Sequence, residues 1–280
     1  MVENIIKNNE TKSSMDMEGE SCPPRKGTIL IKFLPSTITI SAFCVGLTSI
    51  RFALFHRWEL AALCIFVAAL LDALDGKVAR QFGQSSQFGA QLDSLSDLVC
   101  FGVAPPIILF LKSVYLLGSI GWGVCMFFTV CCALRLARFN VDMLQDEEKP
   151  AWEKKYFKGI PAPAGAILAI TPIILFFQTY SYAFLSPWFI SGCLLVSGGL
   201  MISTIRTFSS KILEINKGSA VITLLAISVF VICLITEIWL TLTILVMLYL
   251  FLIPYGVYKY AKTKKEEDRI DIAADVPLAE

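Results

Sequence analysis

Long apolar segments follow one another from residue 35 to residue 258, and short polar connections separate them. Each segment is about 17–23 residues long, close to the roughly 20 residues that a helix needs to cross the ~30 Å core of a bilayer. The pattern therefore predicts an all-α, polytopic membrane protein with about eight transmembrane helices. The predicted spans are Pro35–Leu54, Glu59–Arg80, Gly89–Leu111, Leu116–Arg138, Ala162–Gln178, Pro187–Ile205, Ser219–Thr236 and Ile238–Tyr258.

Individual residues mark several ends of these spans. Pro35 suits the first turn of a helix, where a missing N–H costs no hydrogen bond. The last two spans meet at Thr236 and Glu237, so a tight turn must separate them. Before the fifth span, the sequence KGIPAP at residues 158–163 is expected to break any helix.

The polar segments divide the chain into a membrane domain and two tails. Residues 1–32 begin with a mixed-charge stretch, and because it lacks the apolar core of a signal peptide we expect a disordered cytoplasmic tail. Residues 33–260 form the membrane domain. Residues 261–280 start basic and end acidic, which predicts a second cytoplasmic tail.

Composition excludes several other classes of protein. The chain is 56% hydrophobic with a net charge of +1, so bulk electrostatics give no reason to expect nucleic-acid binding. The nine cysteines form no C-x-x-C motif and mostly lie inside apolar runs, where a thiol behaves as a small hydrophobic group. The single histidine, His56, lies in the first outer connection and receives no catalytic role.

The distribution of basic residues predicts the orientation of the chain. Of the 24 Lys and Arg residues, only Arg57 and Lys112 in the connections after odd-numbered spans, and Arg51 at the end of the first span, are assigned to the outer side. Cytoplasmic connections carry the excess of Lys and Arg, so both termini are predicted to be cytoplasmic. We expect a multi-pass protein of a bacterial inner membrane.

Four aspartates lie beside or inside apolar spans, between residues 72 and 97. A carboxylate at the centre of a bilayer costs roughly 2.5–3.5 kcal/mol on insertion scales, so these groups must lie near the membrane surface, bind cations, or both. Residues three and four apart share a helix face, which predicts two acidic stripes. The first stripe contains Asp72, Asp75, Gly76, Ala79 and Arg80, and the second contains Gly89, Asp93 and Asp97.

Two facing stripes of carboxylates suit hard divalent cations with oxygen ligands, such as Mg²⁺ or Mn²⁺. Two such ions would balance the charge and could clamp a diphosphate. We therefore expect a divalent cation as cofactor, with two ions at the site.

The same residues carry a family resemblance. They match the pattern D-x2-D-G-x2-A-R-x8-G-x3-D-x3-D, by which the chain is identified as a member of the CDP-alcohol phosphatidyltransferases. All eight fixed positions are present: Asp72, Asp75, Gly76, Ala79, Arg80, Gly89, Asp93 and Asp97.

The resemblance implies transfer of a phosphatidyl group from CDP-diacylglycerol to an alcohol, with release of CMP. It implies that Asp97 accepts the proton of the alcohol and that all four aspartates bind metal, Asp97 at the second ion. A stretch PSTIT resembles the family's P-N-x-x-T, with Ser36 in place of the asparagine. The family also implies a homodimer. The residues implied to hold CDP-diacylglycerol are Gly76, Ala79, Arg80, Ser86, Gly89, Ser36 and Thr39.

Three strings outside the motif resemble the serine-accepting branch of that family: SQFGAQLDSLSDLVCFGVAP, ALRLARFNV and FKGIPAPAGA. They imply L-serine as the acceptor and phosphatidylserine as the product. Arg135, Arg138 and Lys158 are natural partners for the serine carboxylate, although they would suit a phosphate equally well.

Several alternatives stay open at this point. Glycerol 3-phosphate as acceptor would make the protein a phosphatidylglycerophosphate synthase. Arg135 and Arg138 could simply reach the membrane surface with their long side chains. Intramembrane acids also mark cation transporters, although such sites lie near the midplane of the bilayer. A phospholipase-D mechanism is excluded, because it needs paired H-x-K motifs.

Overall fold

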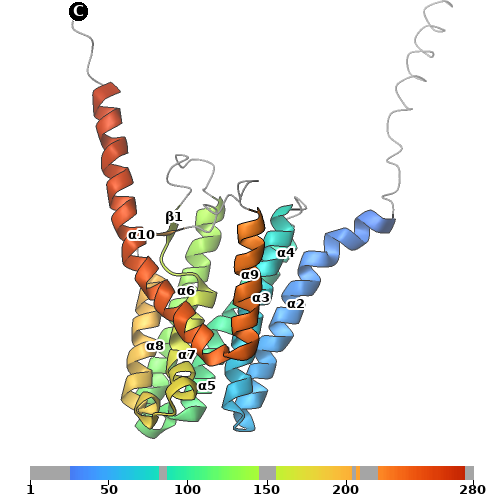
Figure 1. The fold of residues 1–280 in the computed structure, drawn as a ribbon, viewed down its shortest axis with the longest axis vertical. Coiled ribbons are helices and arrows are strands. Elements are labelled where there is room, and N and C mark those ends of the chain that lie inside the picture. The colour runs from blue at the N-terminus through green and yellow to red at the C-terminus, as the bar shows by residue number, and fades with distance from the viewer. Residues whose placement is uncertain (1–25, 82–86, 145–155, 204–205, 209–219, 275–280) are drawn as a thin grey trace, which may run out of the picture.

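The computed structural model describes residues 26–81, 87–144, 156–203, 206–208 and 220–274. The described chain is almost entirely helical, with one short pair of strands (Figure 1). In chain order, the elements are α2 (Lys26–Leu54), α3 (Trp58–Gln81), α4 (Gln87–Asp97), the π-helix η1 (Leu98–Val103), α5 (Ala104–Lys112), the 3₁₀-helix η2 (Val114–Leu117), α6 (Ser119–Leu144), β1 (Tyr156–Lys158), α7 (Ala162–Thr179), the 3₁₀-helix η5 (Tyr182–Leu185), α8 (Pro187–Ile202), β2 (Arg206–Phe208), α9 (Ala220–Thr236) and α10 (Ile238–Ala274).

Helices occupy the described parts of all the predicted spans. Among the described residues, five helices are long and apolar enough to cross a membrane. These five are Ser36–Leu54, Phe88–Lys112, Ser119–Asp142, Ala162–Thr179 and Ile238–Tyr260. Helix α8 is a shorter apolar helix. The structure is therefore that of a polytopic membrane protein, while the count of eight crossings stays a prediction.

Two helices extend beyond their predicted ends. Helix α2 begins at Lys26 rather than at Pro35, so it includes the last part of the segment 1–32 that was predicted to be disordered. The apolar sequence TILIKFL before the proline continues the helix. Helix α10 runs to Ala274, well into the predicted tail, because its Lys- and Glu-rich sequence consists of good helix formers.

The third predicted span is one continuous helical segment that contains a π-helix. Proline at positions 105 and 106 provides no N–H, so the carbonyls of Phe101 and Gly102 cannot receive their ordinary helical hydrogen bonds. The Thr129 hydroxyl of α6 instead donates to the Gly102 carbonyl at 2.9 Å. This exchange explains why the helix widens directly after Asp97, the last residue of α4.

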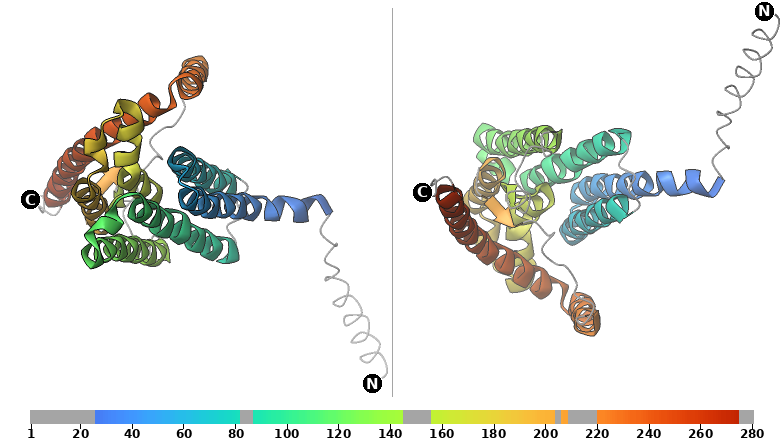
Figure 2. Two further views of the ribbon diagram at one scale, coloured as in Figure 1. Left: turned by 90° about the horizontal axis from the view of Figure 1, so that it is seen from below. Right: turned by 90° about the horizontal axis from the view of Figure 1, so that it is seen from above.

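Helix α7 lies in the middle of the bundle, in contact with α3, α5, α8 and α10 (Figure 2). Half of its residues are buried, and Ile170, Ile173 and Ile174 are almost fully so. Helix α9, by contrast, packs mainly against α10 and exposes many apolar side chains. Only Glu237 lies between the end of α9 and the beginning of α10, which confirms the predicted tight turn.

The beginning of α2 and the end of α10 lie at the same end of the bundle, together with the ends of α3 and α6 (Figure 1). That both tails lie on the cytoplasmic side of a membrane stays a prediction. Strands β1 and β2 pair antiparallel there, with Lys158 opposite Arg206. The sequence pattern did not predict these strands. Gly159 follows β1 with φ +76° and approaches the Met201 carbonyl so closely that a Cβ would lie 2.6 Å from that oxygen.

Candidate active site

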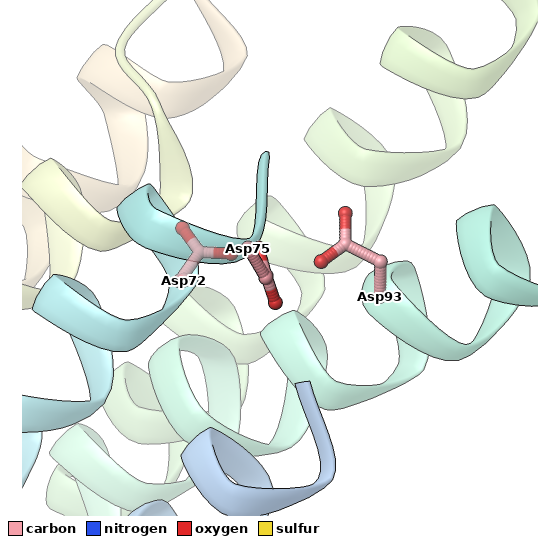
Figure 3. Close-up of side chains that lie close together, drawn as sticks. All are labelled: Asp72, Asp75 and Asp93. Carbon is pink, nitrogen blue, oxygen red and sulfur yellow. The ribbon is translucent and has the colours of Figure 1, made fainter. Parts of the chain in front are cut away.

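Three carboxylates from two helices meet near the end of α3. Asp72 and Asp75 lie one turn apart on α3, and Asp93 faces them from α4 (Figure 3). One oxygen from each of the three lies within 4.8 Å of the other two. Asp75 is only 4% exposed, whereas Asp72 and Asp93 are half-buried. The spacing in the sequence therefore places these three groups around one shared space.

Asp97 lies one turn after Asp93, at the point where α4 passes into the π-helix. Its carboxyl group is within hydrogen-bonding range of the Asp72 carboxyl group. It is not part of the tight group of three. Asp97 thus contacts Asp72 from outside the group of three, and Arg135 of α6 lies close enough to interact with it electrostatically.

Asp75 is held by groups from two helices. The Thr39 hydroxyl of α2 donates a hydrogen bond of 2.8 Å to Oδ2 of Asp75, and both side chains are buried. The backbone N–H of Gly76 also donates to this carboxylate. These two bonds fix the orientation of Asp75 in the way that outer hydrogen bonds orient metal-binding carboxylates.

The residues implied to bind CDP-diacylglycerol lie in several places. Ser36 lies one turn before Thr39 on α2 and is half-buried. Gly76 is exposed, and a Cβ at this position would meet nothing within 4 Å, so the surface beside Asp75 is open to a ligand. Gly89 is half-buried on α4. The backbone of Ala79 and Arg80 belongs to α3 but their side chains lie outside the described part of the structure, as does the whole of Ser86.

Arg135 and Arg138 have different surroundings although both lie at the end of α6. Arg135 is half-buried and lies close enough to Asp97 and Asp72 for a favourable electrostatic interaction. Its guanidinium also lies over the Phe139 ring, 5.5 Å from the centroid. A half-buried cation beside the acidic cluster can bind an anionic group of a substrate.

Arg138 instead reaches the end of α8. Its guanidinium donates to the carbonyls of Ile202 at 3.0 Å and of Ser203 at 3.3 Å. Carbonyls at the end of a helix lack partners within the helix, and a cation there is favourable. The structure thus gives Arg138 a role in holding α6 and α8 together. The backbone of Lys158 lies in β1, and its side chain is outside the described part.

An apolar groove of about 500 Å³ runs between α3, α7 and α10 and reaches Asp72. Its walls include the exposed side chains of Leu70, Leu248 and Leu252, so the groove is open toward the lipid-facing side of the bundle. Its other apolar lining residues include Phe66, Ala73, Ile167 and Leu245. The acidic cluster therefore lies beside a groove of the kind that accepts hydrocarbon.

Sequence reasoning missed two polar groups near this region. The Ser94 hydroxyl donates to Oδ1 of Asn140 at 3.1 Å, which joins α4 to α6 beside Asp93. Tyr249 of α10 lines the apolar groove together with Asp72. The only signal for Tyr249 in the sequence is a hydroxyl inside an otherwise apolar span, which does not show which helix it faces.

The donor set of the cluster fits a hard divalent cation. Three carboxylate oxygens lie around one space, and burial of unbalanced carboxylates is costly. Oxygen-only ligands favour Mg²⁺, Mn²⁺ or Ca²⁺ over metals that prefer sulfur or nitrogen. The cluster could therefore bind a metal ion at the end of an apolar groove.

Comparisons with known proteins agree with this arrangement. A family model described as CDP-alcohol phosphatidyltransferase matches residues 32–196, which contain all four aspartates. A protein of Mycobacterium leprae named CDP-diacylglycerol–serine O-phosphatidyltransferase is 36% identical over 240 residues, 85% of this chain and 79% of that protein.

Proteins of the same name from two other bacteria are also similar to this chain. The one from Helicobacter pylori strain J99 is 34% identical over 197 residues, 69% of this chain and 79% of that protein. The one from Bacillus subtilis is 35% identical over 161 residues, 55% of this chain and 86% of that protein. With the acidic motif, its geometry and these matches together, the chain belongs to the CDP-alcohol phosphatidyltransferase family.

Proposed function

We propose that this chain transfers the phosphatidyl group of CDP-diacylglycerol to the hydroxyl of L-serine, giving phosphatidylserine and CMP. The observation that carries the proposal is the meeting of Asp72, Asp75 and Asp93 beside an apolar groove. A lipid that carries a charged diphosphate needs both features in one place. The names of the relatives support CDP-diacylglycerol as donor and serine as acceptor.

The groove and the cluster suit the two halves of the donor. Exposing an acyl chain to water costs roughly 0.8 kcal/mol of free energy for each CH₂ group. An apolar groove that is open to lipid can hold the chains without exposing them to water. The diphosphate would then lie at the acidic cluster, beside the open surface of Gly76. The side chain of Arg80 and the hydroxyl of Ser86 are further proposed contacts of the cytidine diphosphate.

The four aspartates are the proposed metal ligands, with two ions of Mg²⁺ or Mn²⁺. Bound ions of this kind would neutralise the carboxylates and stabilise negative charge on the phosphoryl oxygens. Hydrogen bonds from the Thr39 hydroxyl and the Gly76 N–H hold one of these proposed ligands, Asp75, in place.

Asp97 is the proposed general base. It is close to Asp72 but outside the tight group of three, so one of its oxygens can face a hydroxyl. The serine oxygen attacks the β-phosphorus, its proton passes to Asp97, and the bond from phosphorus to the bridging oxygen breaks as CMP leaves. No covalent intermediate is proposed, because Cys100 and Cys132, the thiols near Asp97, are each at most 1% exposed.

The proposed setting is a bacterial inner membrane, with both termini in the cytoplasm and two chains in a homodimer. The small number of basic residues in the predicted outer connections supports the orientation. The homodimer rests on family membership alone. In this orientation CMP would leave directly into the cytoplasm.

One experiment tests the acceptor. Purified protein in CDP-diacylglycerol-containing micelles with Mn²⁺ or Mg²⁺ receives L-serine, glycerol 3-phosphate, inositol phosphate or inositol, and CMP release is measured. We expect rapid release with serine alone. Faster release with glycerol 3-phosphate would make the protein a phosphatidylglycerophosphate synthase, and cation flux through liposomes without lipid substrate would instead indicate a transporter.

A further inference from the structure

Tyr249 has a buried hydroxyl group with no hydrogen-bond partner among the described residues. A buried phenol normally finds a partner, and a buried donor that has none costs roughly 1–3 kcal/mol. Such a group therefore needs an explanation, and a bound ligand is one that an enzyme can supply. Tyr249 lies on α10, outside residues 32–196 that the family model covers.

The surroundings of this hydroxyl show which part of the site it faces. Tyr249 lines the same groove as Asp72, so α10 brings its side chain to the region of the acidic cluster. Arg135 of α6 lies close enough to interact electrostatically with Tyr249, and also with Asp97. Three helices therefore place a phenol, a guanidinium and the proposed base in one neighbourhood.

We propose that the Tyr249 hydroxyl and the Arg135 guanidinium together bind the carboxylate of the acceptor, so that Tyr249 determines acceptor specificity. This inference rests on the proposed transfer to serine. The acceptor is the substrate that must touch Asp97, so a cation beside Asp97 faces the acceptor. The diphosphate of the donor has its own site at the three clustered carboxylates.

The donors match a carboxylate in number and charge. Its two oxygens can accept one bond from the phenol and one or two from the guanidinium, which satisfies both buried groups. A phosphate monoester presents three oxygens and more negative charge, and would leave acceptor capacity unfilled at the same two side chains. This pair thus favours an amino acid over a phosphate monoester such as glycerol 3-phosphate.

The test is the variant Tyr249→Phe, which removes one oxygen and keeps the ring. The variant loses one hydrogen bond to the serine carboxylate, and a hydrogen bond to a charged group stabilises a complex strongly. We therefore expect the KM for serine to rise about 10- to 150-fold. The KM for CDP-diacylglycerol should stay unchanged. The value of kcat should fall by a much smaller factor than kcat/KM for serine. Because an unpaired hydroxyl is removed, the melting temperature without substrate should be equal or higher.

Two control variants separate this effect from general damage. Tyr258→Phe removes an exposed phenol from the same helix, and Ser191→Ala removes the other buried hydroxyl that lacks a partner among the described residues. Both should keep the wild-type KM for serine. L-Serine amide, which has no carboxylate, should be a poor acceptor for the wild type and should lose no further activity in Tyr249→Phe.

The outcomes are distinct. A serine KM in Tyr249→Phe equal to that of the wild type overturns the inference and leaves the proposed function intact. A rise in the KM for CDP-diacylglycerol alone also overturns it, because the hydroxyl then contacts the donor. Absence of serine-dependent CMP release in the wild type overturns the proposed function and this inference together. As a second readout, serine added with CMP and metal should raise the melting temperature of the wild type but not of Tyr249→Phe.

Discussion

The hydrogen bond from Thr39 to Asp75 should be needed for tight metal binding. Thr39→Val keeps the shape of the side chain and removes the hydroxyl that donates at 2.8 Å to Oδ2 of Asp75. Thr39 is 5% and Asp75 is 4% exposed, so water cannot easily replace the lost donor. The variant therefore leaves a metal-facing carboxylate less well oriented, with the Gly76 N–H as its remaining donor of known position.

The expected magnitude follows from these contacts. A hydrogen bond to a charged group is worth about 1.5–3 kcal/mol, which corresponds to roughly 10- to 150-fold in a binding constant. Loss of an outer hydrogen bond to a metal ligand typically costs 10–100-fold in metal affinity or activity. We therefore expect the Mn²⁺ concentration for half-maximal activity to rise about 10- to 100-fold in Thr39→Val.

The assay is CMP release at saturating CDP-diacylglycerol and serine, titrated with Mn²⁺ after removal of bound metal. Thr39→Ser should keep most of the affinity, because it keeps the hydroxyl. Thr48→Val is the matched control on the same helix, since the Thr48 hydroxyl donates to the Cys44 carbonyl one turn earlier. An unchanged Mn²⁺ requirement with a raised KM for CDP-diacylglycerol would refute the reasoning. Thr39 would then have the role in CDP-diacylglycerol binding that its sequence motif implies.

Four further substitutions test the cluster and the packing behind it. Asp93→Asn removes a ligand charge and should nearly abolish activity while the protein still inserts and elutes as wild type; full activity after chelator treatment would contradict a metal requirement. Asp97→Asn should retain CDP-diacylglycerol binding but lower kcat by about 10²–10⁴ through loss of the base, and stereochemical analysis should show inversion at phosphorus, whereas retention would indicate a phosphatidyl-enzyme. Gly46→Ala places a methyl group against Sγ of Cys100 and within 2.9 Å of its Cβ, so thermal unfolding in detergent should show destabilisation of about 1–3 kcal/mol. Gly123→Ala, with nothing within 4 Å of the new carbon, should be neutral or slightly stabilising, and equal melting temperatures of these two glycine variants would count against the packing argument.

The sequence was sufficient to predict the helical membrane fold and the meeting of the acids. Both predictions depend on local periodicity: apolar runs of bilayer length give the helices, and spacings of three and four residues place aspartates on one face. The structure brings Asp72, Asp75 and Asp93 together as this spacing requires. Their metal-binding role stays a prediction, as do the CDP-diacylglycerol contacts.

The spacing of residues along the sequence could not predict contacts between helices that are far apart in the chain. Arg135 and Arg138 are three residues apart, which predicted a common role at one site. The Arg138 guanidinium donates a hydrogen bond to the Ile202 carbonyl at the end of α8, whereas Arg135 lies close to Asp97 and Asp72. In the same way, only the packing of α10 against α7 brings Tyr249 toward Asp72, far away in the sequence.

The π-helix shows the same limit on a smaller scale. The prolines after Gly102 are visible in the sequence, but they also occur inside ordinary kinked helices. The donor that completes the widened turn is Thr129 on another helix. Its position depends on how α6 packs against this segment, which no local pattern reports.

Because the groove is open on its lipid-facing side, the relevant donor concentration is the one in the membrane and not the one in bulk solution. Leu70, Leu248 and Leu252 line the groove and are exposed on the lipid-facing surface, so a donor lipid can enter sideways from the bilayer without crossing water. The encounter is then two-dimensional. Its rate depends on the mole fraction of CDP-diacylglycerol in the surrounding leaflet, and dilution with inert lipid should slow the reaction even when the total amount of donor is constant. If the lipid product leaves by the same lateral route, we expect it to compete with the donor for one entrance, so added phosphatidylserine should raise the mole fraction of CDP-diacylglycerol needed for half-maximal rate.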